Sequence, residues 1–193
     1  MSIFVERLQS ASRTNRSLVC VGLDPDPDLM AVPDVLEFNK AIVDATKDLV
    51  CAYKPNLSFY EAQGLPGLEA LEKTVSYIRA VAPGVVVVGD AKRGDIASTN
   101  AKSARALFEV WGFDAATVNA FGGGESLAPF FDYGDKGVFI WCRSSNPGAK
   151  EFQDLKLSQD SGAMPLYEWM ATRASEWNTR GNVGLVVGAT YPD

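Results

Sequence analysis

Short apolar runs alternate along this chain with longer stretches in which apolar residues recur at helical spacing. The apolar runs are continuous and rich in β-branched residues, which is typical of strands buried on both faces. They predict six strands, at Leu18–Leu23, Cys51–Asn56, Val85–Asp90, Ala115–Asn119, Val138–Cys142 and Val183–Val187. The amphipathic stretches predict helices at Phe38–Leu49, Leu68–Val81, Ala97–Trp111 and Leu166–Trp177, and the N-terminus begins like a further amphipathic helix. This alternation indicates right-handed βαβ units and a parallel sheet.

The predicted sheet belongs to the α/β class, in one of two forms. A closed (β/α)₈ barrel needs eight strands, so the six predicted here form either an open sheet or a barrel that lacks its last two units. No linker, repeat or low-complexity segment divides residues 1–193, and we expect a single domain. Proline, glycine and polar residues gather at the strand exits, which is where α/β sheets and barrels both hold their active sites.

Composition narrows the class of partner. The chain has 193 residues, of which 47% are hydrophobic and 22% charged, as in ordinary globular proteins. Its net charge of −6 disfavours nucleic-acid binding, although local lysines could still hold a small anion. No segment approaches the roughly 20 apolar residues of a membrane span, and the N-terminus does not resemble a signal peptide. We therefore expect a cytoplasmic protein with no membrane partner.

The sequence contains no histidine, which removes Ser-His-Asp and Cys-His catalysis and the usual transition-metal sites. Cys20, Cys51 and Cys142 each lie in or beside an apolar run, at spacings that match no metal motif. We expect them to be buried, reduced thiols. Lysine, aspartate, glutamate and tyrosine remain for acid–base chemistry.

The densest group of candidate residues comes directly after four consecutive valines, where Asp90, Lys92 and Asp95 follow within six residues. Asp90 and Lys92 are two apart at a strand end, so their side chains share one face. Turn residues of this kind are often merely solvated. Here, however, the face is the interior of the predicted barrel, where an unpaired charge is costly. A charge-paired functional site is therefore the favoured interpretation.

Three further strand exits carry candidate residues. Lys54 could join the acids in an array of alternating charges, although it could also be a lysine at the barrel rim with its ammonium in solvent. Asp24 could accept hydrogen bonds from a sugar hydroxyl, or act as a plain turn acid. Ser145 could bind the edge of a base, or belong to an ordinary turn. The glycine run Gly122–Gly124 is weak evidence for phosphate binding, and we interpret it as a loop.

The segment Asp90–Ile96 resembles the orotidine 5′-monophosphate decarboxylase family, in particular its longer bacterial branch. Asp-x-Lys-x-x-Asp alone is shared with related sugar-phosphate enzymes, but further matching segments occur in the family's order. These segments are Cys20–Asp26, Ala52–Glu61, Cys142–Ala149 and Val186–Pro192. The resemblance implies a (β/α)₈ barrel of the TIM type that works as a homodimer. It also implies conversion of orotidine 5′-monophosphate to uridine 5′-monophosphate in de novo pyrimidine biosynthesis, without metal or cofactor.

The resemblance also implies a role for each matching residue. Lys92 would donate the proton to C6 of the pyrimidine, and Asp90 would face the departing carboxylate. Lys54 would belong to the charge array and bind the ribose, which Asp24 would also hold. The remaining expected substrate contacts are Ser145, to the pyrimidine, and the group Asp95, Ile96 and Thr99, which would reach in from the partner subunit.

Family members continue past Pro192 into two further strands, which carry a glutamine-bearing closing loop and a glycine–arginine phosphate grip. We therefore expect a domain that is C-terminally incomplete, with only about six βα units. Two alternatives stay open. One is an inactive fragment of the decarboxylase. The other is a related metal-dependent sugar-phosphate lyase or aldolase, which would carry an acid where Lys54 stands.

Overall fold

The computed structural model describes residues 2–159 and 162–190, and it contains the predicted parallel sheet. The strand order is β1-β2-β3-β4-β5-β8, so each of the first five strands pairs with its neighbour in sequence. The bounds are β1 Cys20–Leu23, β2 Ala52–Pro55, β3 Val86–Arg93, β4 Ala115–Val118, β5 Gly137–Arg143 and β8 Val183–Val187. All five pairings are parallel, as the alternation of strands and helices predicts.

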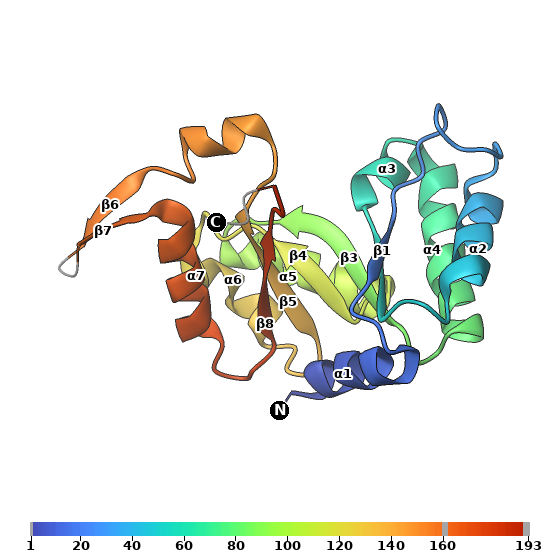
Figure 1. The fold of residues 1–193 in the computed structure, drawn as a ribbon, viewed down its shortest axis with the longest axis horizontal. Helices are drawn as coiled ribbons and strands as arrows, with labels where there is room; N and C mark the ends of the chain where they lie inside the picture. Colours follow the sequence, from blue (N-terminus) through green and yellow to red (C-terminus); the bar gives the residue numbers. More distant parts are fainter. Residues whose placement is uncertain (1, 160–161, 191–193) are drawn as a thin grey trace.

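The sheet curls, with helices on its outer side and α1 across the ends at which the strands begin (Figure 1). The helices are α1 Ile3–Asn15, α2 Val35–Thr46, α3 Leu57–Glu61, α4 Gly64–Val81, α5 Ala97–Arg105, α6 Gly123–Phe131 and α7 Leu166–Trp177. A π-helical turn, η1 (Ala106–Val110), continues α5, and a 3₁₀ turn, η2 (Pro147–Glu151), follows β5. In the described part of the chain, no helix is both long and apolar enough to cross a membrane.

Two predictions about local structure were wrong. The glycine run is not simply a loop, because Gly123 and Gly124 form the first turn of α6. Cys51 and Cys142 are buried, but Cys20 is exposed. Cys20 begins β1, which pairs on one side only, with β2, in the sheet that the structure describes. Burial raises the pKa of the Cys51 and Cys142 thiols, which therefore stay protonated at neutral pH.

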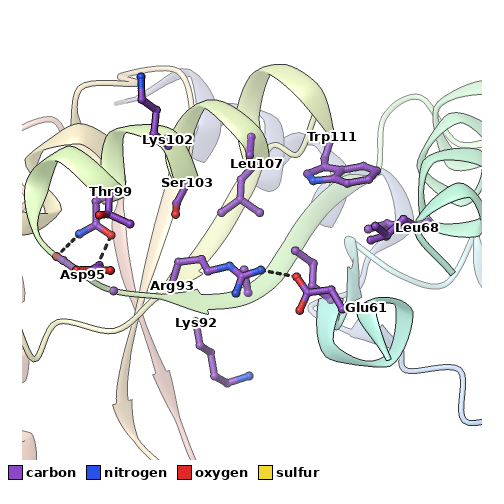
Figure 2. A pocket seen from close by; sticks show the side chains of 16 residues that line it. Glu61, Leu68, Lys92, Arg93, Asp95, Thr99, Lys102, Ser103, Leu107 and Trp111 are labelled. Carbon is purple, nitrogen blue, oxygen red and sulfur yellow. Dashed lines mark hydrogen bonds and ion pairs between the residues drawn. The ribbon is translucent and has the colours of Figure 1, made fainter. Parts of the chain in front are cut away.

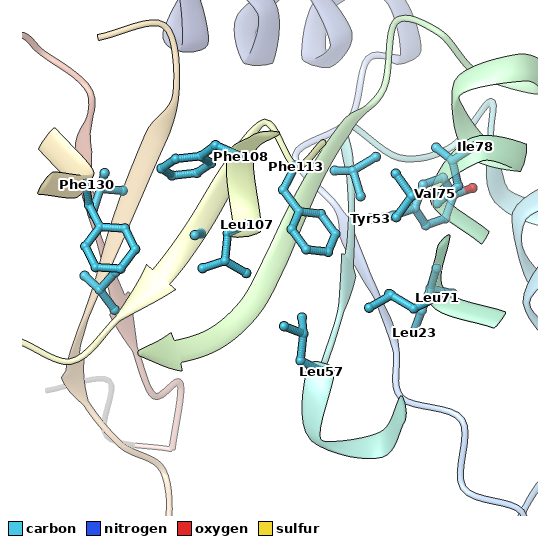
Figure 3. Packing of buried hydrophobic residues seen from close by; sticks show 14 of the residues in the cluster. Leu23, Tyr53, Leu57, Leu71, Val75, Ile78, Leu107, Phe108, Phe113 and Phe130 are labelled. Carbon is cyan, nitrogen blue, oxygen red and sulfur yellow. The ribbon is translucent and has the colours of Figure 1, made fainter. Parts of the chain in front are cut away.

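The main hydrophobic core lies between the sheet and the outer helices (Figure 3), where Tyr53, Phe113 and Phe130 are fully buried. A second cluster joins α1 to the inner side of the sheet, and its rings Phe4 and Phe139 meet edge to face at 5.9 Å. α1 therefore closes the end of the curled sheet at which the strands begin. The opposite end, where the strands finish, is left for polar groups.

Asp114 ties these layers together from the start of β4. Its buried carboxylate contacts Arg7 of α1 at 2.6 Å and Arg79 of α4 at 2.7 Å, and it accepts a hydrogen bond from the backbone N–H of Val87. A buried acid with two cationic partners and one backbone donor has its charge well compensated. Asp114 therefore fixes α1, α4 and β3 relative to one another, at the end of the sheet opposite the candidate site.

Candidate active site

Asp90 lies near the end of β3 with an ammonium group on each carboxylate oxygen. Lys54, from β2, donates to Oδ2 at 2.8 Å, and Lys92 donates to Oδ1 at 2.7 Å. Asp90 is 6% exposed, whereas the two lysine side chains are about one third exposed. The carboxylate thus forms the floor of the site, and the ammonium groups lie between it and solvent. The structure thus brings Lys54, Asp90 and Lys92 together at one end of the sheet.

Asp90 and Lys54 support each other's ionisation. Burial by itself raises the pKa of Asp90, but hydrogen bonds from Lys54, Lys92 and Thr117 outweigh it, and the net pKa lies below the ordinary 3.8. Burial likewise lowers the pKa of Lys54, and the hydrogen bond and charge of Asp90 more than reverse this. At neutral pH the site therefore holds one carboxylate, an ionised Lys54 and its neighbour Lys92.

A bulge in β3 produces this arrangement. The register of β3 with β4 runs from Gly89↔Ala116 to Arg93↔Val118, so extra residues of β3 stand opposite a short stretch of β4. Lys92 lies inside the bulge with φ at 45°, in the left-handed region that residues with side chains seldom adopt. Gly94 follows, where a Cβ would lie 2.3 Å from the carbonyl oxygen of Asn119, so only glycine fits this approach.

Asp24 stands beside the array at the exit of β1. In the register between β1 and β2, Gly22 lies opposite Lys54, and the carboxylate of Asp24 folds back over Gly22. Desolvation lowers the pKa of Lys54, and the charge of Asp24 adds to the larger effect of Asp90 in raising it. Asp24 is exposed, so its carboxylate remains accessible to a ligand.

Asp95, Ile96 and Thr99 lie at the beginning of α5, outside this array. The Asp95 carboxylate accepts a hydrogen bond from the backbone N–H of Ile96, and Asn100 bonds the backbone of Asp95. Asp95, Thr99 and Lys92 are among the residues that line a cavity of about 570 Å³. In Figure 2 the Lys92 side chain points away from Asp95 and Thr99, on the other side of β3. The structure therefore does not bring Asp95 to the Lys92 ammonium of its own chain.

Ser145 lies exposed in the loop after β5, which is separated from β3 by β4. The buried guanidinium of Arg143 supports this loop through the carbonyl oxygen of Ser144 and the side-chain oxygen of Gln153. On the other side, a Cβ at Gly188 would lie 2.8 Å from the backbone nitrogen of Ser145, so the chain after β8 packs directly on the loop. In the part of the chain that the structure describes, Ser145 forms no hydrogen bond with Lys54 or Lys92.

Sequence reasoning missed Thr117, which contacts both Asp90 and Lys92 from the neighbouring strand. The available signal was a single polar residue inside the apolar segment Ala115–Val118. Such a residue must find a hydrogen-bonding partner when its strand is buried.

A curled parallel sheet with outer helices, and with its charged group at the strand exits, defines an α/β enzyme of the TIM-barrel type. The model of the orotidine 5′-phosphate decarboxylase / HUMPS family matches residues 17–193. An orotidine 5′-phosphate decarboxylase from Thermomicrobium roseum is 52% identical over 196 residues, which cover 98% of this chain and 68% of that protein. One from Dehalococcoides mccartyi strain 195 is 47% identical and is covered to 70%. The chain belongs to the orotidine 5′-phosphate decarboxylase / HUMPS family.

Solved structures agree with this assignment. The OMP decarboxylase of Leishmania donovani superimposes with a TM-score of 0.86 at 40% identity, over 100% of this chain and 72% of that one. The UMP synthase of the same organism gives a TM-score of 0.87 at 41% identity, over 100% of this chain and 41% of that one. The predicted fold class is confirmed, with six strands of the barrel in the described residues.

Proposed function

We propose that this chain converts orotidine 5′-monophosphate to uridine 5′-monophosphate and carbon dioxide, as a step of pyrimidine biosynthesis, without metal or organic cofactor. The observation that carries the proposal is the Asp90 carboxylate held between the ammonium groups of Lys54 and Lys92, at 2.8 and 2.7 Å. The decarboxylase names of the relatives support the same reaction. Lys54 argues against the sugar-phosphate lyase alternative, because an acid is expected at that position there.

The chemical problem is a localised negative charge. When the bond between C6 and the carboxylate breaks, the electron pair remains on C6 in the plane of the ring, where ring resonance cannot absorb it. The site must stabilise this charge and then deliver a proton to C6. The Lys92 ammonium can do both, because it is a fixed positive charge and also a general acid. Once the bond to carbon dioxide has broken, the proton of Lys92 passes to C6. Water then reprotonates the neutral amine. Asp90 keeps the ammonium oriented before any substrate binds.

The other residues would hold the nucleotide around this centre. Asp90 would face the substrate carboxylate and disfavour it electrostatically until neutral carbon dioxide leaves. Lys54 and Asp24, which lie on adjacent strands, would bind the ribose hydroxyls. Ser145 would contact the pyrimidine from the loop after β5. Each assignment is supported by the position of the residue at a strand exit.

The active unit would be a homodimer with shared sites. Asp95, Ile96 and Thr99 would enter the partner's site, with Asp95 completing the charge array there. Two observations support this: Asp95 does not face Lys92 of its own chain in Figure 2, and Ile96 is 66% exposed at the start of α5. At this exposed position Ile96 is available to pack against a partner subunit.

Turnover tests the function directly. The 193-residue chain, dialysed against a chelator, is incubated with orotidine 5′-monophosphate labelled at the carboxylate. We expect uridine 5′-monophosphate and labelled carbon dioxide in equal amounts. A folded chain without turnover would support the fragment alternative, and turnover that returns only with added metal would contradict the cofactor-free proposal.

Mixing two inactive variants tests the shared site. In a mixed dimer of Lys92→Ala with Asp95→Ala, one of the two sites receives Lys92 from one chain and Asp95 from the other. We expect roughly a quarter of wild-type turnover after random subunit exchange, since about half of the dimers are mixed and each has one intact site. The control mixes Lys92→Ala with Lys54→Ala. Both lysines belong to the array of a single chain, so neither site of the mixed dimer is intact and no turnover should return. Failure of the first mixture to recover activity would show that Asp95 serves its own subunit.

A further inference from the structure

Thr117 is the polar residue of β4, which otherwise consists of Ala115, Ala116 and Val118. It is 1% exposed and lies opposite the bulge of β3. A buried hydroxyl is costly unless it is hydrogen bonded, so its contacts indicate what it does in this position.

The Thr117 hydroxyl acts both as a hydrogen-bond donor and as an acceptor, and both of its partners lie on β3. It donates to Oδ1 of Asp90 at 2.7 Å, and it accepts from the backbone N–H of Lys92 at 2.9 Å. Oδ1 of Asp90 is also the oxygen that binds the Lys92 ammonium, at 2.7 Å. The contacts therefore form a closed ring through Thr117, the Asp90 carboxylate, and the side chain and backbone of Lys92.

This ring lies where the backbone most needs support. Between Gly89 and Arg93 the regular pairing of β3 with β4 is interrupted, and the Lys92 N–H finds a side-chain hydroxyl as its acceptor. The φ of 45° at Lys92 is unfavourable for a residue with a side chain, and such conformations persist only when their surroundings fix them. Thr117 supplies that fixation from a rigid neighbouring strand.

We propose that Thr117 is a positioning residue for the reaction, and that its hydroxyl sets the direction of the Lys92 ammonium by joining the Asp90 carboxylate to the Lys92 backbone. The inference rests on the proposed function, in which Lys92 donates the proton. Without the hydroxyl, the Lys92 N–H loses its acceptor and Asp90 loses one of its donors. The bulge can then relax, and the ammonium moves away from the position at which C6 would be protonated.

The test compares Thr117→Val, which keeps the shape but removes the hydroxyl, with Thr117→Ser, which keeps the hydroxyl. The control is Thr74→Val, because Thr74 is equally buried and accepts a hydrogen bond from Asn39 in the core behind the sheet. We expect Thr117→Val to lower kcat by about 10- to 100-fold with little change in KM, as a misdirected group does. Thr117→Ser should restore most of kcat, and Thr74→Val should leave it unchanged.

A pH profile separates positioning from mere packing. Asp90 is faced by Lys54 from β2, by Lys92 from its own strand and by Thr117 from β4, and Asp24 and the Cys20 thiol lie near Lys54. The Thr117 hydrogen bond lowers the pKa of Asp90, so its removal raises that pKa. The acid limb of kcat/KM should therefore move to higher pH in Thr117→Val and return in Thr117→Ser.

Hydrogen exchange of the Lys92 amide decides the case independently of turnover. We expect its protection to fall at least about tenfold in Thr117→Val, because the bond that protects it is gone. A wild-type kcat or a fully protected Lys92 amide in Thr117→Val would overturn the proposal, as would a Thr117→Ser variant no better than Thr117→Val.

If the unmodified chain fails to turn over substrate, the proposed function fails while the exchange result still decides the position of Lys92. Should Thr117→Val not fold, Thr117→Cys gives the same comparison, since a thiol is a weak donor.

Discussion

Lys92→Ala is expected to abolish decarboxylation while binding of uridine 5′-monophosphate remains measurable. Contacts to the ribose exist in both the ground state and the transition state, so they survive the substitution. The ammonium acts mainly after charge has developed at C6, so its loss falls on the chemical step. One preorganised donor is worth about 10²–10³ in rate, and a general acid about 10²–10⁴. Because one group does both, we expect a loss of about 10⁴-fold or more.

The measurement is turnover and calorimetric binding of uridine 5′-monophosphate on the same folded variant. Lys73→Ala is a suitable control, because Lys73 is 60% exposed on α4 and pairs only loosely with Glu69, at 3.7 Å. It removes the same charge and should leave both quantities unchanged. If Lys92→Ala kept even a tenth of wild-type turnover, Lys92 would not be the proton donor.

The strands were predictable because most are short apolar runs between turn residues. Val183–Val187 agrees at both ends, whereas β3 extends beyond the predicted Asp90 to Arg93. That extension lies in and after the bulge, where the charged Asp90, Lys92 and Arg93 interrupt the apolar signal. The bulge depends on how β3 pairs with β4, and the pattern of residues along one strand carries no information about that pairing.

Helix boundaries depend on caps more than on periodicity. α2 begins at Val35, before the predicted Phe38, because the Asp34 side chain accepts from the backbone N–H of Glu37 at 2.9 Å. α6 was missed because it begins with glycines and contains Pro129, which are unfavourable signals for a helix. The antiparallel hairpin of β6 (Lys156–Gln159) and β7 (Gly162–Pro165) was missed because its short strands carry no apolar run.

The candidate site was predictable to the extent that it depends on topology. Parallel strands finish at one edge of the sheet, so Lys54 and Asp90, each at a strand exit, had to lie near one another. Which carboxylate oxygen each lysine binds depends on tertiary geometry, as does the support from Thr117. The same holds for Asp95, whose direction is set by the turn before α5, where Gly94 packs on Asn119.

Asp90→Asn is expected to strengthen binding of orotidine 5′-monophosphate relative to uridine 5′-monophosphate, and to slow turnover by about 10²–10³-fold, the effect of losing one preorganised charge. The substitution keeps the shape of the side chain but removes the negative charge from the floor of the site. Lys54 and Lys92 then attract the substrate carboxylate without opposition. The product has no carboxylate, so its affinity should change little.

Turnover falls in Asp90→Asn for two reasons, since Lys92 loses its charged anchor and the departing carboxylate is no longer repelled. The measurements are the two dissociation constants and single-turnover rates, with Asp44→Asn as the control for net charge, because Asp44 lies exposed on α2 beside Lys47. In the wild type the pKa of Asp90 is below 3.8. Its charge is therefore fully present at neutral and mildly acidic pH, and is lost only as the pH falls through that lowered pKa, so the wild-type affinity ratio should stay constant from neutral to mildly acidic pH. Weaker binding of orotidine 5′-monophosphate relative to uridine 5′-monophosphate in Asp90→Asn would mean that Asp90 does not face the substrate carboxylate.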